Sequence, residues 1–342
     1  MENLHFRAMR YAIWNNKGGV GKTFLSFIIA TEYANSHREE PVIVVDMCPQ
    51  ANLSEIVLGG NGRGAENLQK LIDAKKTVGG YFDSRISSPH QLTGSETDFI
   101  IHAGEFNVQA PSNLWIIAGD PSLEIQAQVI NQISGQTLPE DAWKSVHYWL
   151  KDVIVACSAK LGPSSTKVFI DCNPSFSAYT ELAMMASERL IVPCSSDGSS
   201  ARAINNLGAL LYGFGENKYQ SVQLKSRADR YRMPLPLIHS VVMNRSTQYD
   251  KRASKAFRAM FEAIQERVES LRLKEPSNFV SGKSIFHDIP DSHSVSVVCS
   301  HLGLPLYALD PGQYAVHDEN PQVNSEPLNR YKKAALEFVE LV

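Results

Sequence analysis

Residues 15–23 (Asn-Asn-Lys-Gly-Gly-Val-Gly-Lys-Thr) carry the residue types that bind phosphate groups, and they lie between a short apolar run and a helical pattern. Glycines let the backbone wrap around phosphate oxygens, while N–H groups and a helix N-terminus supply positive potential. Lys22 adds a charge, and the Thr23 hydroxyl can ligate Mg²⁺. We interpret the run as a nucleotide loop. A glycine-rich turn that binds nothing is disfavoured, because Gly21, Lys22 and Thr23 all stand at the positions that a phosphate-binding loop requires between a strand and a helix.

Composition and charge are those of an ordinary globular chain. The 342 residues are 43% hydrophobic and 20% charged, with a net charge of −3. These values exclude a disordered or fibrous chain, and any contact with nucleic acid must come from a local basic patch. No apolar run approaches the ~18 to 20 residues of a membrane span, and Met1 to Arg10 lacks the apolar core of a signal peptide. We expect a cytoplasmic protein.

Five cysteines occur without a C-x-x-C pair, and this odd number predicts free thiols in a reducing compartment. Three of them, Cys48, Cys172 and Cys194, each follow a predicted strand. They could gather at one sheet edge as a redox or metal site. We favour small buried thiols, which are common at such positions.

Apolar, β-branched runs alternate with helical patterns, which predicts an α/β fold with a mostly parallel sheet flanked by helices on both faces. We expect one domain over residues 1–342, because candidate nucleotide-site residues are spread from about 15 to 291. Residues 59–113, with a helix near 65–74, and residues 213–236 interrupt the alternation as excursions. The predicted strands are Tyr11 to Trp14, Val42 to Val45, Leu114 to Ile117, Val168 to Ile170, Leu190 to Val192 and Leu237 to Met243.

The second lysine of the loop, Lys17, is absent from ordinary P-loops. With residues 18–23 it resembles the deviant Walker A motif of the ParA/MinD superfamily of P-loop ATPases, and the opening Asn15-Asn16-Lys17 resembles the ParA branch. This resemblance implies ATP and Mg²⁺ as cofactors, and a Lys17 that reaches the nucleotide of a partner subunit. Phe24 departs from the family, which has a second Thr or Ser there. The implied nucleotide contacts are Gly18, Gly19, Val20, Gly21, Lys22, Thr23 and Phe24.

Asp46 ends the second predicted strand, and residues 46–52 resemble the ParA switch segment Asp-x-Asp-Pro-Gln-x-Asn. The resemblance implies that Asp46, like Lys17 and Lys22, is a catalytic residue. The second family Asp, which positions the attacking water, is replaced by Cys48. A thiol with its ordinary pKa of ~8.5 is a poor substitute for a carboxylate. We therefore expect slow hydrolysis but intact nucleotide binding.

Asp171 ends the fourth predicted strand and resembles the Walker B aspartate. The resemblance implies that Asp171 contacts the coordination shell of Mg²⁺, together with Thr23 and Asp46. An alternative is an Asp that only caps the helix beginning near Ser177. The Asn-Pro-Ser that follows resembles the second switch of the family and favours the metal role.

Asn244 follows the strand that ends at Met243 and resembles the adenine-reading Asn of the family. Pro290 and Asp291 resemble the segment that lines the adenine pocket. Taken alone, an Asn at a strand end is more often a turn former. Asn244, however, is one of several candidate nucleotide-site residues that each follow a predicted strand, and this favours the adenine role.

The resemblance implies an ATP-dependent homodimer that binds DNA without sequence preference and is reset when a partner protein stimulates hydrolysis, as in plasmid partition or cargo positioning. Phosphate contacts need only a basic stripe. Glutamates on the same helix, Glu262, Glu266 and Glu269, equally fit a solvated mixed face. The candidate DNA contacts are Arg202, Lys251, Lys255 and Arg258, with a further basic cluster between Lys225 and Arg232.

Other functions stay open. The chain could be an ATP-gated interaction module with little hydrolysis in a regulatory or defence complex, which Cys48 and the two excursions favour. A metabolic ligase is disfavoured, because no substrate motif stands out. Membrane binding is not expected, since the apolar positions of the closing helix near 328–342 are typical of core packing. These positions are Ala335, Leu336, Val339 and Val342.

Overall fold

An eight-stranded sheet forms the centre of the fold in the computed structural model, which describes residues 8–162, 165–195, 198–214, 223–246, 250–282, 284–292 and 294–342. The strand order is β3-β4-β2-β5-β1-β6-β7-β8, and every neighbouring pair is parallel except β3 with β4. The strands are β1 Ala8–Ile13, β2 Val42–Met47, β3 Ile101–His102, β4 Leu114–Ile117, β5 Thr166–Cys172, β6 Arg189–Cys194, β7 Leu237–Ser246 and β8 Phe286–Pro290.

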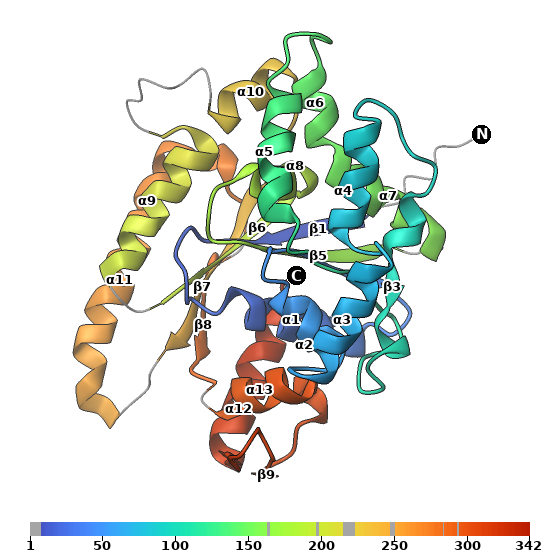
Figure 1. Cartoon of the computed structure of the whole chain (residues 1–342). Helices are drawn as coiled ribbons and strands as arrows, with labels where there is room; N and C mark the ends of the chain where they lie inside the picture. Colours follow the sequence, from blue (N-terminus) through green and yellow to red (C-terminus); the bar gives the residue numbers. More distant parts are fainter. Residues whose placement is uncertain are drawn as a thin grey trace.

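Helices cover both faces of this sheet and bury a separate apolar core against each (Figure 1). The face with the smaller set of helices carries α1 Lys22–Ser36, α2 Asn52–Val57, α3 Arg63–Asp73, α12 Ser294–Leu302 and α13 Ser325–Val339. The opposite face carries α4 Val78–Ser87, α5 Leu123–Ser134, α6 Ala142–His147, α7 Trp149–Leu161, α8 Ala178–Ala186, α9 Gly198–Tyr212, α10 Leu224–Arg230 and α11 Asp250–Lys274. The pair α9 and α11 lies side by side at one end of the sheet (Figure 1).

Short elements complete the chain. A small hairpin, β9 Gly312–Gln313 and β10 Gln322–Val323, joins α12 to α13. Single turns of 3₁₀ helix lie at Glu96–Phe99, Ala103–Glu105, Pro276–Asn278 and Leu306–Ala308.

The central strand β1 shows why the two cores form. Its successive side chains point to opposite faces of the sheet. Ala12 lies in the core under α8, whereas Tyr11 and Ile13 lie in the core under α1. Burial on both faces accounts for the continuous apolar runs of the sequence, which is the pattern of a parallel sheet.

The α/β fold class is confirmed, and each of the six predicted strands is present. The sequence did not predict β3 and β8 at the two edges of the sheet. The excursion 59–113 contains α3, near the expected helix 65–74, and α4. The excursion 213–236 contains α10, and residues 215–222 lie outside the described part.

The closing helix α13 packs against α1 and β8, as core packing predicts. Ala335 and Val339 are buried there, but the prediction is wrong for Leu336, whose side chain is 41% exposed. Within the described residues, no helix combines the length and the apolar character needed to span a membrane.

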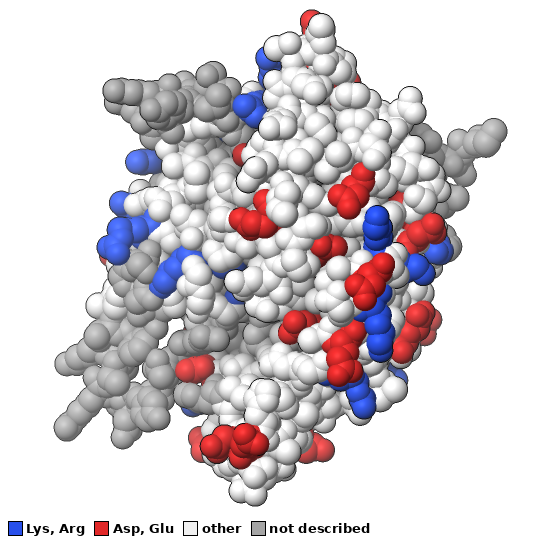
Figure 2. All heavy atoms as spheres, viewed as in Figure 1, with Lys and Arg blue, Asp and Glu red and all other residues white. Residues whose placement is uncertain are grey.

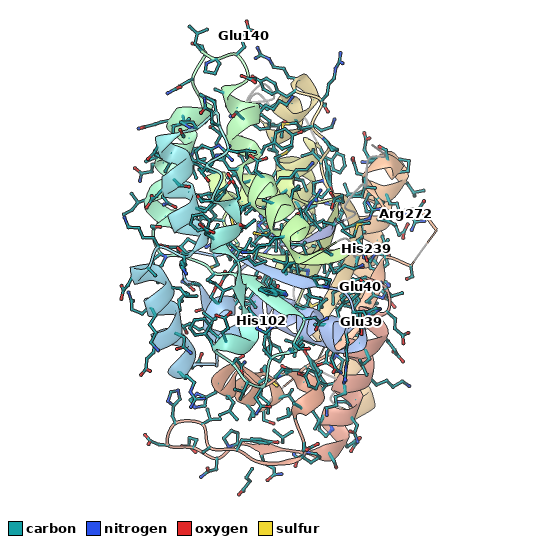
Figure 3. All side chains as sticks on the ribbon, turned by 90° about the vertical axis from the view of Figure 1, so that its right-hand side faces the viewer. Glu39, Glu40, His102, Glu140, His239 and Arg272 are labelled. Carbon is teal, nitrogen blue, oxygen red and sulfur yellow. The ribbon has the colours of Figure 1, made fainter. Side chains whose placement is uncertain are left out.

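All five cysteines are free and buried, as predicted. In the described part of the chain, no three His, Cys, Asp or Glu side chains gather in a way that could hold a metal ion, so the cysteine metal site is not supported. His239 lies on β7 within the sheet (Figure 3). Its ring packs edge-on against that of Tyr11, with ring centroids 5.3 Å apart. This histidine therefore has a core role.

One acidic side chain, Glu32 of α1, is buried at 2% exposure and accepts the Tyr307 N–H at 2.8 Å. Burial raises its pKa from 4.5 to about 7, against the opposing effects of this hydrogen bond and of Lys332. The folded state therefore binds the Glu32 proton more tightly than the unfolded state does. It follows that stability contributed by protonated Glu32 is present in acid and is lost as the pH rises through about 7.

We expect Glu32→Gln to weaken the decline of unfolding free energy between pH 5 and pH 8. Gln keeps an acceptor for the Tyr307 N–H but cannot ionise, and a shift of this size corresponds to roughly 3 kcal/mol. Urea unfolding of both proteins at the two pH values measures the difference. Equal pH slopes for wild type and variant would show that Glu32 ionises without cost.

Candidate nucleotide site

The nucleotide loop connects the end of β1 to the start of α1, as the sequence predicts. Gly19 and Gly21 take φ values of 74° and 77°, in the left-handed region that favours glycine. The Asn15 amide donates to Pro193 O at 2.8 Å and so ties the loop to the end of β6. The loop is thereby held at the carboxyl edge of the sheet, where ligands of open α/β folds bind.

The two lysines of the loop are held differently. Lys22 Nζ is buried and donates to the carbonyls of Asn15 at 3.2 Å and Lys17 at 2.8 Å. Burial lowers the pKa of Lys22, while the nearby Asp171 opposes that shift. Lys17 Nζ donates to Ser195 Oγ at 2.7 Å, after β6 of the same chain.

Two carboxylates lie side by side where β2 and β5 end. Asp46 and Asp171 are register partners on these neighbouring strands, and their exposures are 0% and 1%. Burial raises the pKa of both groups, and the charge of Asp46 raises that of Asp171 further. Two like charges at such a buried position favour a cation between or beside them.

Hydroxyl groups of α1 reach the second carboxylate. Thr23 Oγ1 donates to Asp171 Oδ2 at 2.8 Å, so the predicted metal residues Thr23, Asp46 and Asp171 lie together. Ser26 Oγ, which has a single proton to donate, lies within hydrogen-bond distance of both Asp171 Oδ1 at 3.0 Å and Lys22 O at 2.9 Å, and sequence reasoning missed its place beside Asp171. The spacing could have predicted this contact, because Ser26 lies three residues after Thr23 and so on the same side of the helix.

Cys48 occupies the start of the segment after β2. Its Sγ accepts a hydrogen bond from Asn173 Nδ2 at 3.6 Å. Burial raises the pKa of the thiol to about 12, and the charge of Asp46 adds to this shift. The group is therefore a neutral thiol at physiological pH and cannot act as a carboxylate would. Asn173 Oδ1 accepts from Ser175 N and Oγ, which fixes the orientation of the amide.

Lys22, Thr23 and Cys48 border a pocket of about 450 Å³. Phe24, in place of the family hydroxyl residue, lines it and stacks on Tyr331 with ring centroids 6.2 Å apart. The lining residues are Gly19, Gly21, Lys22, Thr23, Phe24, Cys48, Gln50, Asn52, Ile56, Asn61, Cys172, Pro174 and Ser300.

The predicted adenine residues come from the ends of β7 and β8, which pair in parallel. Asn244 is buried, and its Nδ2 donates to Val20 O at 2.9 Å and Gly21 O at 3.3 Å. Pro290 is buried and Asp291 is half-buried. In this structure the Asn244 amide therefore holds the nucleotide loop, a contact that sequence reasoning did not predict.

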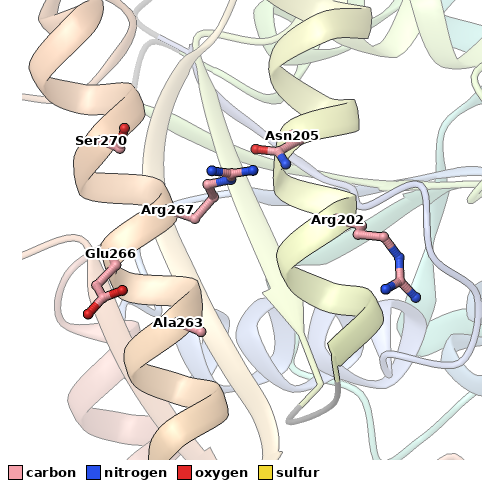
Figure 4. Close-up of a pocket in the computed structure, with 6 residues that line it drawn as sticks. All are labelled: Arg202, Asn205, Ala263, Glu266, Arg267 and Ser270. Carbon is pink, nitrogen blue, oxygen red and sulfur yellow. The ribbon is translucent and has the colours of Figure 1, made fainter.

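A second hollow of about 400 Å³ lies between α9 and α11 (Figure 4). The Arg267 guanidinium points across it toward Asn205, while Arg202 points away from α11 and is exposed. The side chains of Lys251, Lys255 and Arg258 lie outside the described residues. The residues around the hollow are Arg202, Asn205, Ala263, Glu266, Arg267 and Ser270.

Several solved structures share this fold at low sequence identity. Cyanothece McdA in its apo form is 15% identical, with a TM-score of 0.59 over 96% of this chain and 99% of that one. A putative plasmid partition protein from Borrelia burgdorferi B31 bound to AMPPNP is 16% identical, with a TM-score of 0.56 over 98% and 100%. A Corynebacterium diphtheriae protein, DIP2308, is 17% identical, with a TM-score of 0.59 over 86% and 97%. No curated protein matches the sequence significantly.

The family model described as the CobQ/CobB/MinD/ParA nucleotide binding domain matches residues 11–280, which include the nucleotide loop and both carboxylates. The matched range covers most of the chain, including most of the parallel sheet and the loop at its carboxyl edge. The chain therefore belongs to the CobQ/CobB/MinD/ParA family of nucleotide-binding proteins.

Proposed function

We propose that the protein binds ATP with Mg²⁺ at this loop, forms an ATP-dependent homodimer, hydrolyses ATP slowly, and acts in DNA partition or cargo positioning. The observation that carries the proposal is the meeting of Lys22, Thr23, Asp46 and Asp171 at one edge of the sheet. A point charge, a hydroxyl and two carboxylates are the groups that a metal-bound triphosphate requires. In this proposal residues 1–342 work as one ATPase unit.

The loop backbone would hold the phosphates, because its N–H groups and the N-terminus of α1 supply positive potential. Lys22 would neutralise phosphate charge, and Asp46, Asp171 and Thr23 would hold Mg²⁺, which neutralises charge on the transferred phosphoryl group. Asn244, Pro290 and Asp291 would contact the base. Reading the base requires Asn244 to release part of its contact with Val20 and Gly21. The proposed phosphate contacts are Gly18, Gly19, Val20, Gly21, Lys22, Thr23 and Phe24.

Lys17 would complete the site of the partner subunit. Its Nζ group now bonds to Ser195 of its own chain, so dimer formation exchanges this contact for a charged phosphate. The present bond pairs the Lys17 ammonium with a neutral hydroxyl, whereas a phosphate oxygen carries the opposite charge and attracts the ammonium more strongly. This exchange would make dimer formation depend on ATP.

DNA binding is proposed for the surface over α9 and α11. Basic atoms gather over α9, whereas basic and acidic atoms are interspersed over α3 (Figure 2). Arg202 would contact DNA phosphates together with Lys251, Lys255 and Arg258, and Arg267 extends the set across the hollow. The description of the Borrelia structure as a putative plasmid partition protein supports a role in partition. A partner protein that stimulates hydrolysis would reset the cycle.

A second function, an ATP-gated interaction module with little hydrolysis, is favoured by Cys48. The neutral thiol accepts a hydrogen bond from Asn173 where the family has a carboxylate for the attacking water. In that case the long-lived ATP dimer, rather than turnover, carries the function.

Replacing Cys48 with Asp is expected to raise steady-state ATP turnover by roughly 10²- to 10⁴-fold, because the carboxylate can orient the attacking water. Cys48→Ala is the matched control and should stay slow, and Lys22→Ala reports contaminating activity. Each protein is assayed with and without nonspecific duplex DNA. DNA stimulation of the wild type would favour the partition cycle over the interaction module. Equal rates for Cys48→Asp and Cys48→Ala would contradict the role assigned to Cys48.

Lys17→Ala is expected to abolish ATP-dependent dimerisation, because it removes the charge that crosses to the partner's nucleotide. Size-exclusion chromatography with ATP and Mg²⁺ in the buffer, followed by light scattering, measures the molar mass of the eluted species and so separates monomer from dimer. Lys333→Ala, which alters an exposed lysine of α13, should dimerise like the wild type. A dimer that persists in Lys17→Ala would rule out the contact between subunits.

A further inference from the structure

We propose that Ser54 is a positioning residue that fixes the Asp46 carboxylate for the magnesium-bound nucleotide. The proposal rests on the nucleotide site proposed above and adds a residue to it. Ser54 lies on α2, eight residues after Asp46, and both side chains have 0% exposure.

Two hydrogen bonds from Ser54 converge on one oxygen of the carboxylate. Ser54 N donates to Asp46 Oδ2 at 2.9 Å, and Ser54 Oγ donates to the same atom at 2.8 Å. The other oxygen, Oδ1, accepts the Cys48 N–H at 3.1 Å. Because hydrogen bonds weaken steeply away from linear geometry, this set restricts rotation of the carboxylate.

The segment that follows β4 sets the direction of the Ser54 hydroxyl. Gly119 N, just after β4, donates to Ser54 Oγ at 2.8 Å. A hydroxyl has a single proton, and its oxygen already accepts from Gly119, so the proton goes to Asp46. A Cβ at position 119 would lie 3.0 Å from Asp46 Cγ and 2.9 Å from Ala51 Cβ, so only glycine allows this approach.

The same segment ties the carboxylate to the excursion 59–113. Asp120 accepts the hydroxyl of Thr77, the residue that caps α4, and Val78 N donates to Ala118 O at 2.8 Å. A chain of buried polar contacts therefore runs from α4 through the end of β4 to Ser54 and Asp46. This arrangement gives the excursion a structural role in the site. Outer-shell partners of this kind typically change metal affinity by roughly 10- to 100-fold.

The test compares Ser54→Ala with Ser54→Thr, which keeps a hydroxyl, and with Ser158→Ala, which removes a buried serine hydroxyl from α7, far from the loop in sequence. The affinity of each full-length protein for a fluorescent ATP analogue is titrated twice, with Mg²⁺ and with EDTA. Thermal unfolding of the nucleotide-free proteins is recorded in parallel. If Ser54→Ala does not fold, Ser54→Cys takes its place, because a thiol is a weak donor.

The expected result is an affinity loss of about 10-fold for Ser54→Ala with Mg²⁺, little change with EDTA, and recovery in Ser54→Thr. Ser158→Ala should bind like the wild type. An equal loss in both titrations, or no loss with Mg²⁺, would overturn the role of Ser54 while leaving the nucleotide site in place. A wild type that binds no analogue with Mg²⁺ would instead overturn the proposed function, and this inference with it.

Discussion

The arrangement of this site depends on two buried carboxylates that the sheet forces together. Asp46 and Asp171 are register partners on β2 and β5, and neither is exposed to water by more than 1%. Burying like charges is costly unless hydrogen bonds and opposite charges compensate. The neighbouring elements supply that compensation: Ser54 holds Asp46, Thr23 and Ser26 hold Asp171, and Lys22 lies close enough to oppose its pKa shift. The remaining charge is what a bound cation would neutralise.

The strand order explains why so many separate segments reach this point. Strands β2, β5 and β1 are adjacent, so the carboxylates lie beside the loop that follows β1. Strands β6 and β7 continue the sheet and hold that loop from its other side, through the contacts of Asn15 and Asn244. The lysine that departs from ordinary P-loops, Lys17, bonds to Ser195 at the end of β6. A nucleotide site at the carboxyl edge of parallel strands is thus built from tertiary neighbours.

Much of this could be predicted from the sequence, because both the loop and the buried strands are local patterns. The edge strand β8 could not, because His287 and Asp288 interrupt its apolar run, and β3 has only two residues. The partners of the site residues also escaped prediction. Ser54 meets Gly119 only because β2 and β4 are neighbours, and Asn173 meets Cys48 only because β2 and β5 are. Such contacts depend on strand order, which no single segment specifies.

The most direct measurement is the unfolding free energy of Asp171→Asn and wild type in urea at pH 8, each with EDTA and with ATP and Mg²⁺. If the paired carboxylates are kept for a cation, the variant should be more stable than the wild type with EDTA, by about 1 to 3 kcal/mol, because it removes one buried charge. It should also lose the stabilisation that ATP and Mg²⁺ give the wild type. A variant that is less stable with EDTA, yet is stabilised by ATP and Mg²⁺ as much as the wild type, would contradict this account.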